Sequence, residues 1–232
     1  MRLDRFLHDV GFGTRKDIDR LIRAGKVVVD GVVAKKGALS IAPTAEVFVE
    51  EELVPYEPLQ YIMLNKPKGV VSATTDAVDE TVLDLLPERF FYMGVAPVGR
   101  LDKDTTGLLI LSNDGPFAHR LTSPKKNIGK TYIASYTGSL KKDAVARCEV
   151  GIELSDFTTA PATLRLLEDG WLELTITEGK FHQVKRMVHA LGGEVTSLCR
   201  VQIGGLVLDE DLEEGEWRSL TEEEKALLFH QF

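Results

Sequence analysis

Apolar residues at the start of the chain recur at helical spacing, over 3–7 and again over 18–22. Thr14 is a typical N-cap for the second of these segments, and Gly25 is a typical residue to follow its last turn. Two short runs of valine then flank an Asp-Gly pair within 27–33, which is a strong signal for a β-hairpin with a two-residue turn. The pattern therefore predicts a small helix–helix–hairpin unit.

Two prolines, Pro55 and Pro58, interrupt this pattern, because proline opposes both helix and sheet. We expect a domain boundary here, with one domain over 1–57 and a longer one over 58–232. In the longer domain the pattern predicts strands over 61–64, 108–111, 130–136 and 171–177, with extended structure over 70–72. It predicts helices over 81–86, 116–121 and 181–191, and a capping box at 221–224 begins a last helix. Strands outnumber helices without regular alternation, so the expected fold class is α+β with a largely antiparallel sheet.

Composition narrows the class of protein. The 232 residues are 44% hydrophobic and 28% charged, as in ordinary globular domains. No apolar run approaches the ~18 to 20 residues of a membrane-spanning helix, and the charged first residues do not resemble a secretory signal. We therefore expect a cytoplasmic protein without membrane contact. Cys148 and Cys199 lie far apart, so neither a disulfide framework nor a four-ligand zinc site is expected.

The net charge of −8 argues against a nucleic-acid partner until the charges are located. Between 209 and 224, nine acids accompany a single base, Arg218, and this segment accounts for the whole excess. Residues 1–40, by contrast, hold nine bases and five acids, and residues 100–130 hold six bases and three acids. Basic charge is thus concentrated in two zones.

The first basic zone follows the second predicted helix, where side chains three or four residues apart share one side. A solvated helix face without a ligand would show the same pattern. The helix–helix–hairpin order, with Arg-Leu-Asp at 2–4 and Gly-Lys-Val-Val-Val-Asp-Gly at 25–31, resembles the RNA-binding module named after the fourth ribosomal protein of the small subunit. The residues that such a module would offer to RNA phosphates are Arg2, Arg15, Lys16, Arg20 and Arg23.

The segment 99–111 combines two carboxylates, an arginine and two hydroxyls in a polar loop directly before an apolar strand. By chemistry alone this loop could hold a metal, bind a phosphate or carry a catalytic carboxylate. It lacks the residue order of a nucleotide-binding loop and the acid spacing of an EF-hand, which favours carboxylate catalysis. A structural role stays open, in which Asp102 caps a turn and pairs with Arg100, and so does Asp104 as the reactive carboxylate.

Gly-Arg-Leu-Asp-Lys-Asp-Thr-Thr-Gly-Leu-Leu at 99–109 resembles the signature around the catalytic aspartate of pseudouridine synthases, in the branch that modifies ribosomal RNA. Further stretches match in order: the amino-terminal module, Asn-Lys-Pro-Lys-Gly at 65–69, Lys-Thr-Tyr at 130–132, Glu-Gly-Lys-Phe-His-Gln-Val-Lys-Arg-Met at 178–187 and Arg-Val-Gln-Ile-Gly at 200–204. The resemblance covers nearly the whole chain. It implies a mixed, mostly antiparallel central sheet with the catalytic cleft along it, and no metal or organic cofactor.

The resemblance also implies roles for three residues. The reaction breaks the bond between uracil and ribose, turns the detached base and joins its carbon 5 to the same sugar carbon. Asp102 would add covalently to the sugar, stabilise its cation or remove a sugar proton. Tyr132 would stack on the displaced uracil near the proton that leaves carbon 5. Lys185 would pair with Asp102, at a position where other branches carry arginine. Lysine lacks the bidentate fork of arginine, so the geometry of the pair would differ.

The implied partner is ribosomal RNA, either 16S rRNA or a partly assembled small subunit, bound by a monomer. The residues expected to contact RNA near the pocket are Arg100, Lys103, Lys130, His182, Arg186 and Arg200. A non-catalytic ribosome-assembly factor would share the module and the basic zones, and only the set of Asp102, Tyr132 and Lys185 separates the two. A retaining glycoside hydrolase using Asp102 and Asp104 would leave the amino-terminal module without a purpose.

Overall fold

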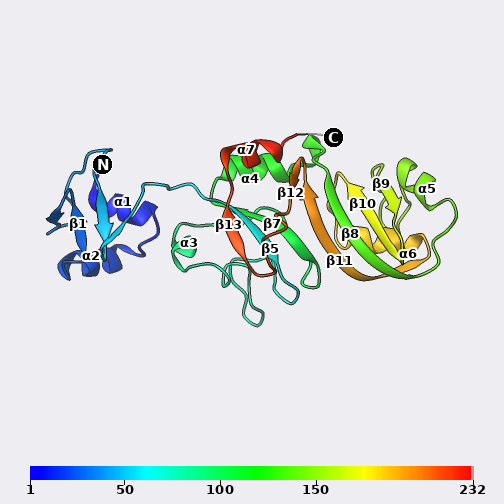
Figure 1. Cartoon of the computed structure of the whole chain (residues 1–232), viewed down its shortest axis with the longest axis horizontal. Coiled ribbons are helices and arrows are strands. Elements are labelled where there is room, and N and C mark those ends of the chain that lie inside the picture. Colours follow the sequence, from blue (N-terminus) through cyan, green and yellow to red (C-terminus); the bar gives the residue numbers. More distant parts are fainter. Residues whose placement is uncertain (231–232) are drawn as a thin grey trace.

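The computed structural model describes residues 1–230, which form two units joined by an extended segment (Figure 1). The first unit has its own apolar core, drawn from residues between Leu3 and Val54. It contains two helices and a four-stranded antiparallel sheet with the strand order β2-β1-β3-β4. Its elements are α1 (Leu3–Asp9), α2 (Arg15–Arg23), β1 (Val27–Val29), β2 (Val32–Val33), β3 (Val47–Val49) and β4 (Glu52–Leu53).

Helix α2 begins and ends where the sequence predicts. Thr14 and Asp17 form a capping box, in which the Thr14 N–H donates to Asp17 Oδ2 at 3.0 Å. Gly25, with φ +72°, follows the last turn. Asp30 and Gly31 have φ values of 49° and 78°, as the predicted two-residue turn between β1 and β2 requires. The helix–helix–hairpin order is confirmed.

The second hairpin, β3–β4, was not predicted. Its turn residues, Glu50 and Glu51, adopt φ values of 51° and 74°. Residues other than Gly, Asn and Asp seldom occupy this region, so the sequence carries no turn signal here. The backbone N–H of Glu50 donates to the carbonyl of Lys26 at 2.9 Å, which helps to hold the turn beside the start of β1.

The joining segment keeps contact with the first unit. The ring of Tyr56 stacks on Phe6 with centroids 5.2 Å apart, and its hydroxyl donates to Asp9 Oδ2 at 2.9 Å. The turn after α1 also approaches the second unit, because a Cβ at Gly11 would lie 2.4 Å from the carbonyl oxygen of Arg89. A side chain at position 11 would therefore collide with the backbone of the second unit, so this contact between the units requires glycine.

The second unit is built on one large sheet with the strand order β13-β5-β7-β11-β8-β10-β9. All neighbours in this order are antiparallel except β7 and β11, which run parallel. The predicted α+β fold class with a mixed, mostly antiparallel sheet is confirmed. The strands are β5 (Tyr61–Lys66), β7 (Thr106–Ser112), β8 (Lys130–Gly138), β9 (Thr163–Leu166), β10 (Trp171–Ile176), β11 (Gly193–Ile203) and β13 (Trp217–Ser219), with β6 (Ala96–Pro97) beside β7 and β12 (Leu206–Val207) beside β11.

Around β5 and β7 the large sheet is covered on both faces. Along β7, Leu109 and Leu111 pack into one core while Leu108 and Ile110 pack into another, as the alternation of a strand dictates. The first core includes residues of α3 (Arg89–Tyr92), α5 (Ala144–Val150) and α6 (Gln183–Ala190), and the second includes residues of α4 (Gly115–Thr122), with α7 (Glu222–Leu227) beside it; a short 3₁₀ helix spans Pro124–Lys126. Within residues 1–230, no helix has the length and apolar character needed to cross a membrane.

The helix predicted over 81–86 is absent, and this prediction was wrong. Thr81 instead forms a bridge with Val71, and the Val82 N–H donates to the Val71 carbonyl at 3.0 Å. Asp84 Oδ2 accepts hydrogen bonds from the backbone N–H and the hydroxyl of Thr81 at 2.7 and 2.8 Å. Aspartate and threonine form such local bonds in turns, in competition with the helical bonding pattern. The segment consequently folds as successive turns.

Candidate active site

Three segments from distant parts of the sequence meet at one pocket in the second unit. Asp102 lies in the loop between β6 and β7, Tyr132 lies in β8, and Lys185 lies in the first turn of α6. All three line the same pocket, together with Arg100 and His182. The residues that the sequence singled out as a catalytic set are therefore neighbours in space.

Lys185 bridges two carboxylates. Its Nζ lies 3.1 Å from Asp102 Oδ2 and 2.5 Å from Asp104 Oδ1, and its side chain is 22% exposed. Partial burial opposes the charge on Lys185, but the hydrogen bonds to Asp104 and Asp102 outweigh it and raise the lysine pKa above its ordinary value. The hydrogen bond from Lys185 also holds the pKa of Asp104 below its usual range. The site thus contains a cation held between two carboxyl groups.

The loop that carries Asp102 is fixed by a buried lysine. Lys66, at the end of β5, is 0% exposed, and its Nζ donates to the carbonyls of Pro67 and Thr105 at 3.0 Å each. Burial lowers the pKa of Lys66 to about 8. Ser72 holds the other side of the loop, because its Oγ donates to the Leu101 carbonyl at 2.9 Å and accepts the Leu101 N–H at 3.0 Å.

Sequence reasoning assigned no role to Lys66 or Ser72. The expected strand over 61–64 ended before the lysine, because the stretch Asn-Lys-Pro-Lys-Gly at 65–69 was interpreted as stopping it. The observed strand continues through Lys66 and keeps its ammonium inside. The only sequence signal for Lys66 was its place in the stretch 65–69, which is one of the family motifs.

Tyr132 contributes an aromatic wall to the pocket. It is 7% exposed and belongs to the core shared by α6 and the sheet. On β8 it is paired with Leu174 of β10 and with Arg200 of β11, so its backbone is fixed on both sides. A rigid strand is a precise support for a ring that must meet a planar ligand.

His182 reaches Asp102 from the start of α6. It is the N-cap residue of that helix, with φ +50°, and its Nε2 lies 3.6 Å from Asp102 Oδ2. Its side chain is 42% exposed. Asp102 therefore has a permanent cation, Lys185, and an imidazole within reach on the same helix.

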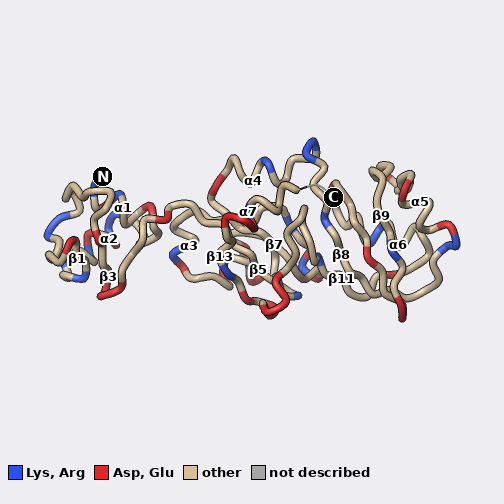
Figure 2. Tube along the Cα trace, turned by 45° about the horizontal axis from the view of Figure 1, so that its top comes forward, with Lys and Arg blue, Asp and Glu red and all other residues tan. Residues whose placement is uncertain are grey.

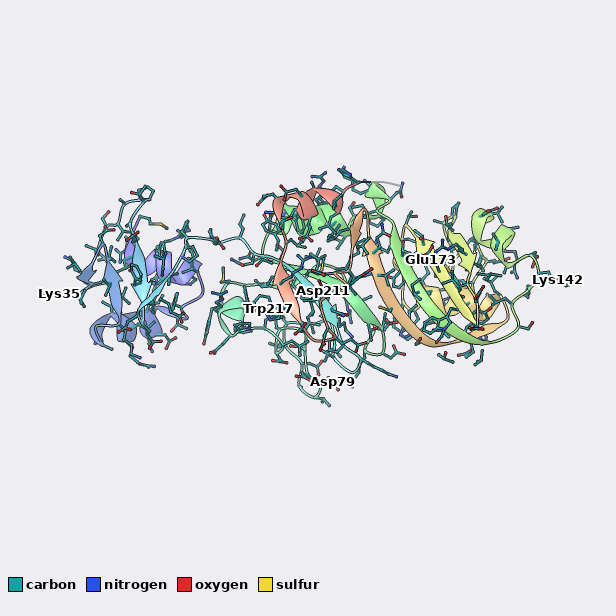
Figure 3. The ribbon with its side chains drawn as sticks, viewed as in Figure 1. Lys35, Asp79, Lys142, Glu173, Asp211 and Trp217 are labelled. Atoms are coloured by element: carbon teal, nitrogen blue, oxygen red, sulfur yellow. The ribbon has the colours of Figure 1, made fainter. Side chains whose placement is uncertain are left out.

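The basic residues expected to contact RNA near the pocket differ in their surroundings. Arg100 is exposed at the pocket. Lys103 is exposed but pairs with Asp79 at 2.6 Å, on a loop that projects from the second unit (Figure 3). Arg186 pairs with Asp156 and donates to Ser155 Oγ at 3.2 Å. Binding of a phosphate by Lys103 or Arg186 would thus compete with an internal carboxylate.

Two of the expected RNA contacts point inward. Arg200 is 3% exposed, and its Nε donates to the Leu108 carbonyl at 2.8 Å. Lys130 donates to the Ile128 carbonyl at 3.2 Å, and burial together with the charge of Arg200 lowers its pKa to about 8. Arg200 lies on β11, an inner strand of the sheet, and its expected contact with RNA stays a prediction.

The basic residues of the first unit are all on the surface. Figure 2 shows Lys and Arg spread over this unit, while the acids of 209–216 gather beside β13 and β5. Arg2 pairs with Asp4 at 2.5 Å, and Arg20 lies 3.7 Å from Asp17. The exposed bases that the sequence predicted for this unit are Arg2, Arg15, Lys16, Arg20 and Arg23.

An aspartate paired with lysine, facing a tyrosine in the cleft of a mixed sheet, together with a basic helix–helix–hairpin unit, is the arrangement of an RNA-modifying isomerase. Comparison with known families gives the same class. Residues 60–190 match the family described as RNA pseudouridylate synthase, and residues 1–47 match the S4 domain. The chain belongs to the RNA pseudouridylate synthase family, whose members convert uridine in RNA to pseudouridine.

Individual relatives extend this similarity to the whole chain. The sequence is 43% identical to a ribosomal small subunit pseudouridine synthase A of Vibrio cholerae, over 99% of this chain and 100% of the relative. It is 44% identical to an uncharacterized RNA pseudouridine synthase, YtzG, of Bacillus subtilis, over 98% of each chain. A crystal structure of a pseudouridylate synthase matches with a TM-score of 0.69 and 41% identity, over 98% of this chain and 99% of that one.

Proposed function

We propose that this protein isomerises a uridine of ribosomal RNA, and specifically of 16S rRNA in the small subunit, with Asp102 as the catalytic carboxylate. The observation that carries the proposal is the Asp102–Lys185 pair at 3.1 Å in a pocket that Tyr132 also lines. The specific substrate is supported by full-length similarity to relatives named for the ribosomal small subunit, in Vibrio cholerae and Escherichia coli among others.

The roles of the three residues follow from charge and shape. When the bond between uracil and ribose breaks, the sugar becomes electron-poor, and the Asp102 carboxylate can add to it, stabilise it or remove a proton from it. Lys185 offsets the negative charge of that carboxylate as the RNA displaces water from the pocket. Tyr132 gives the detached uracil a face to stack on while it turns. Its phenol takes part in the transfer of the proton that leaves carbon 5.

The uridine reaches this pocket only when it is out of its helical stack, which costs a few kcal/mol. We assign the corresponding RNA contacts to Arg100, exposed beside the pocket, and to the exposed bases of residues 1–57, acting as a separate domain. Two weak contacts on one RNA strengthen each other through effective concentration. The protein acts as a monomer in this scheme, since one chain supplies every residue that it uses.

The test is to incubate the protein with 16S and 23S rRNA transcripts and with partly assembled small subunits, without any cofactor, and to map pseudouridine by carbodiimide adducts and primer extension. One modified uridine in 16S rRNA is expected. Modification confined to 23S rRNA would refute the 16S assignment, and binding of 16S rRNA without modification would indicate a non-catalytic assembly factor.

Asp102→Asn and Asp104→Asn form a matched pair for the same assay, because both acids bond the same Lys185 Nζ and both changes remove one charge. Losing the reactive carboxylate should reduce the single-turnover rate by about 10⁴-fold or more. Asp104, whose side chain is 59% exposed, should tolerate the change within about tenfold. Full activity of Asp102→Asn, or a complete loss in Asp104→Asn alone, would move the role to another residue.

A further inference from the structure

An exposed aromatic stack extends from the active-site carboxylate to the surface. Phe181 is 76% exposed directly before α6, and its ring stacks on His182 with centroids 3.8 Å apart and an interplanar angle of 17°. The imidazole itself lies 3.6 Å from Asp102. Because His182 covers one face of the Phe181 ring, the high exposure of Phe181 leaves its other face open to solvent.

The backbone beneath this stack is held in place. His182 has a left-handed φ of +50°, which a residue with a side chain adopts at a cost and keeps only where its surroundings enforce it. Gln183 is 3% exposed and enforces it from below: its Oε1 accepts the Lys180 N–H at 2.9 Å, and its Nε2 donates to Glu178 Oε1 at 2.7 Å. Glu178 in turn accepts the Ala160 N–H at 2.8 Å. The stack is therefore preorganised.

The segment that carries Phe181 also holds two cations, Lys180 and Arg186. Lys180 Nζ lies 3.6 Å from the centroid of the Phe157 ring, and the guanidinium of Arg186 lies 5.1 Å from the same centroid. Both cations are close in sequence to Phe181. Sites for single-stranded nucleic acid combine exposed aromatic rings with cations, since the base stacks while the cations attract the backbone. A protein partner would favour further apolar residues around the ring, whereas Phe181 is flanked by Lys180 and His182.

We propose that Phe181, supported by His182, is a stacking subsite for a second nucleobase, that of a nucleotide adjacent to the target uridine. This inference rests on the proposed function, because it places the target uridine at Asp102. Stacking of the neighbouring base on Phe181 would replace the stacking that it loses when the uridine leaves the helix. The subsite therefore selects RNA whose strand is already open on one side of the uridine.

The subsite is tested with short RNA hairpins centred on the rRNA uridine that the wild-type protein modifies. In separate hairpins, the nucleotide before or after this uridine is made abasic. Dissociation constants and single-turnover rates are measured for the wild type, Phe181→Ala and Phe181→Trp. Phe91→Ala is the matched control, because Phe91 is also an exposed aromatic, 52% exposed on α3, outside the pocket.

Removing one of the two neighbouring bases should weaken wild-type binding by roughly 5- to 150-fold. Phe181→Ala should weaken binding of the intact hairpin by a similar factor, and the combination should cost no more than either change alone. Phe181→Trp should restore binding and Phe91→Ala should leave it unchanged.

The subsite would be refuted if Phe181→Ala bound the intact hairpin as tightly as the wild type does. It would also be refuted if the losses of affinity caused by Phe181→Ala and by the abasic nucleotide multiplied when the two changes were combined. In either case, turnover by the wild type would still support the proposed function. A wild-type protein that forms no pseudouridine in any ribosomal RNA would instead overturn the proposed function, and the subsite with it.

Discussion

Replacing Tyr132 by phenylalanine removes the phenolic hydroxyl from the pocket and keeps the aromatic ring. Tyr132 is 7% exposed and packed in the core, and none of the hydrogen bonds described for residues 1–230 involves its hydroxyl. The Phe variant should therefore fold with a stability within about 1 kcal/mol of the wild type. Any large kinetic effect then reports on the phenol itself.

The expected size of that effect separates the two jobs of the residue. Loss of a positioned acid or base costs about 100- to 10,000-fold in rate, whereas loss of stacking costs about 1–3 kcal/mol, or roughly 5- to 150-fold in binding. Tyr132→Phe should therefore bind rRNA almost normally but finish little pseudouridine. Tyr132→Ala should lose both, and, as a truncation in the core, about 3–5 kcal/mol of stability as well.

The assay is single-turnover release of tritium from uridine labelled at ring carbon 5, with saturating protein and parallel filter binding. Thermal unfolding serves as the control for the Ala variant, since 3–5 kcal/mol corresponds to a fall in Tm of roughly 6–20 °C for a protein of this size. If Tyr132→Phe released tritium at the wild-type rate, the phenol would have no chemical role and only stacking or packing would remain.

Two further predictions concern parts of the molecule away from the reacting atoms. Removing residues 1–57 should leave the second unit cooperatively folded, since its cores are separate from that of the first unit. It should weaken rRNA binding and flatten the log–log salt slope by up to about 4 if the five bases predicted to contact RNA all bind phosphates; unchanged affinity or salt dependence would contradict this. Burial lowers the pKa of Lys66 from 10.5 to about 8, so the unfolded chain binds more protons between these values and the free energy of unfolding should rise with pH across that window. Urea unfolding at pH 7.5 and 10 should show a smaller rise in Lys66→Met, and an equal rise would show that Lys66 does not titrate in this range.

The local signals in the sequence predicted the parts of the fold that local chemistry controls. The cap at Thr14 and the turn at Asp30-Gly31 act over a few residues, and both appear as expected. The Glu50-Glu51 turn escaped prediction because residues elsewhere hold it in an unfavourable conformation. The prediction of a helix over 81–86 was wrong because the local pattern contains no sign of the bridge between Thr81 and Val71.

The site was predictable only in part, for a different reason. The bond between Lys185 and Asp102 joins residues 83 positions apart, and no periodicity in either segment indicates the other. The family motifs supplied that connection. They could not show that Lys66 supports the Asp102 loop from inside or that Arg200 is enclosed by the sheet, because both depend on the depth of a side chain in the finished core.

The position of β11 determines when a newly made chain can become active. β7 and β8 are synthesised before β11, yet β11 lies between them in the sheet. Until it inserts, each neighbour has an unpaired edge, and the halves carrying Asp102 and Tyr132 are not joined through the sheet. The first unit, by contrast, has its whole core by residue 54 and its contacts are local, so it can fold early during synthesis. The nascent protein should therefore acquire its RNA-binding unit first and its assembled pocket in one late step.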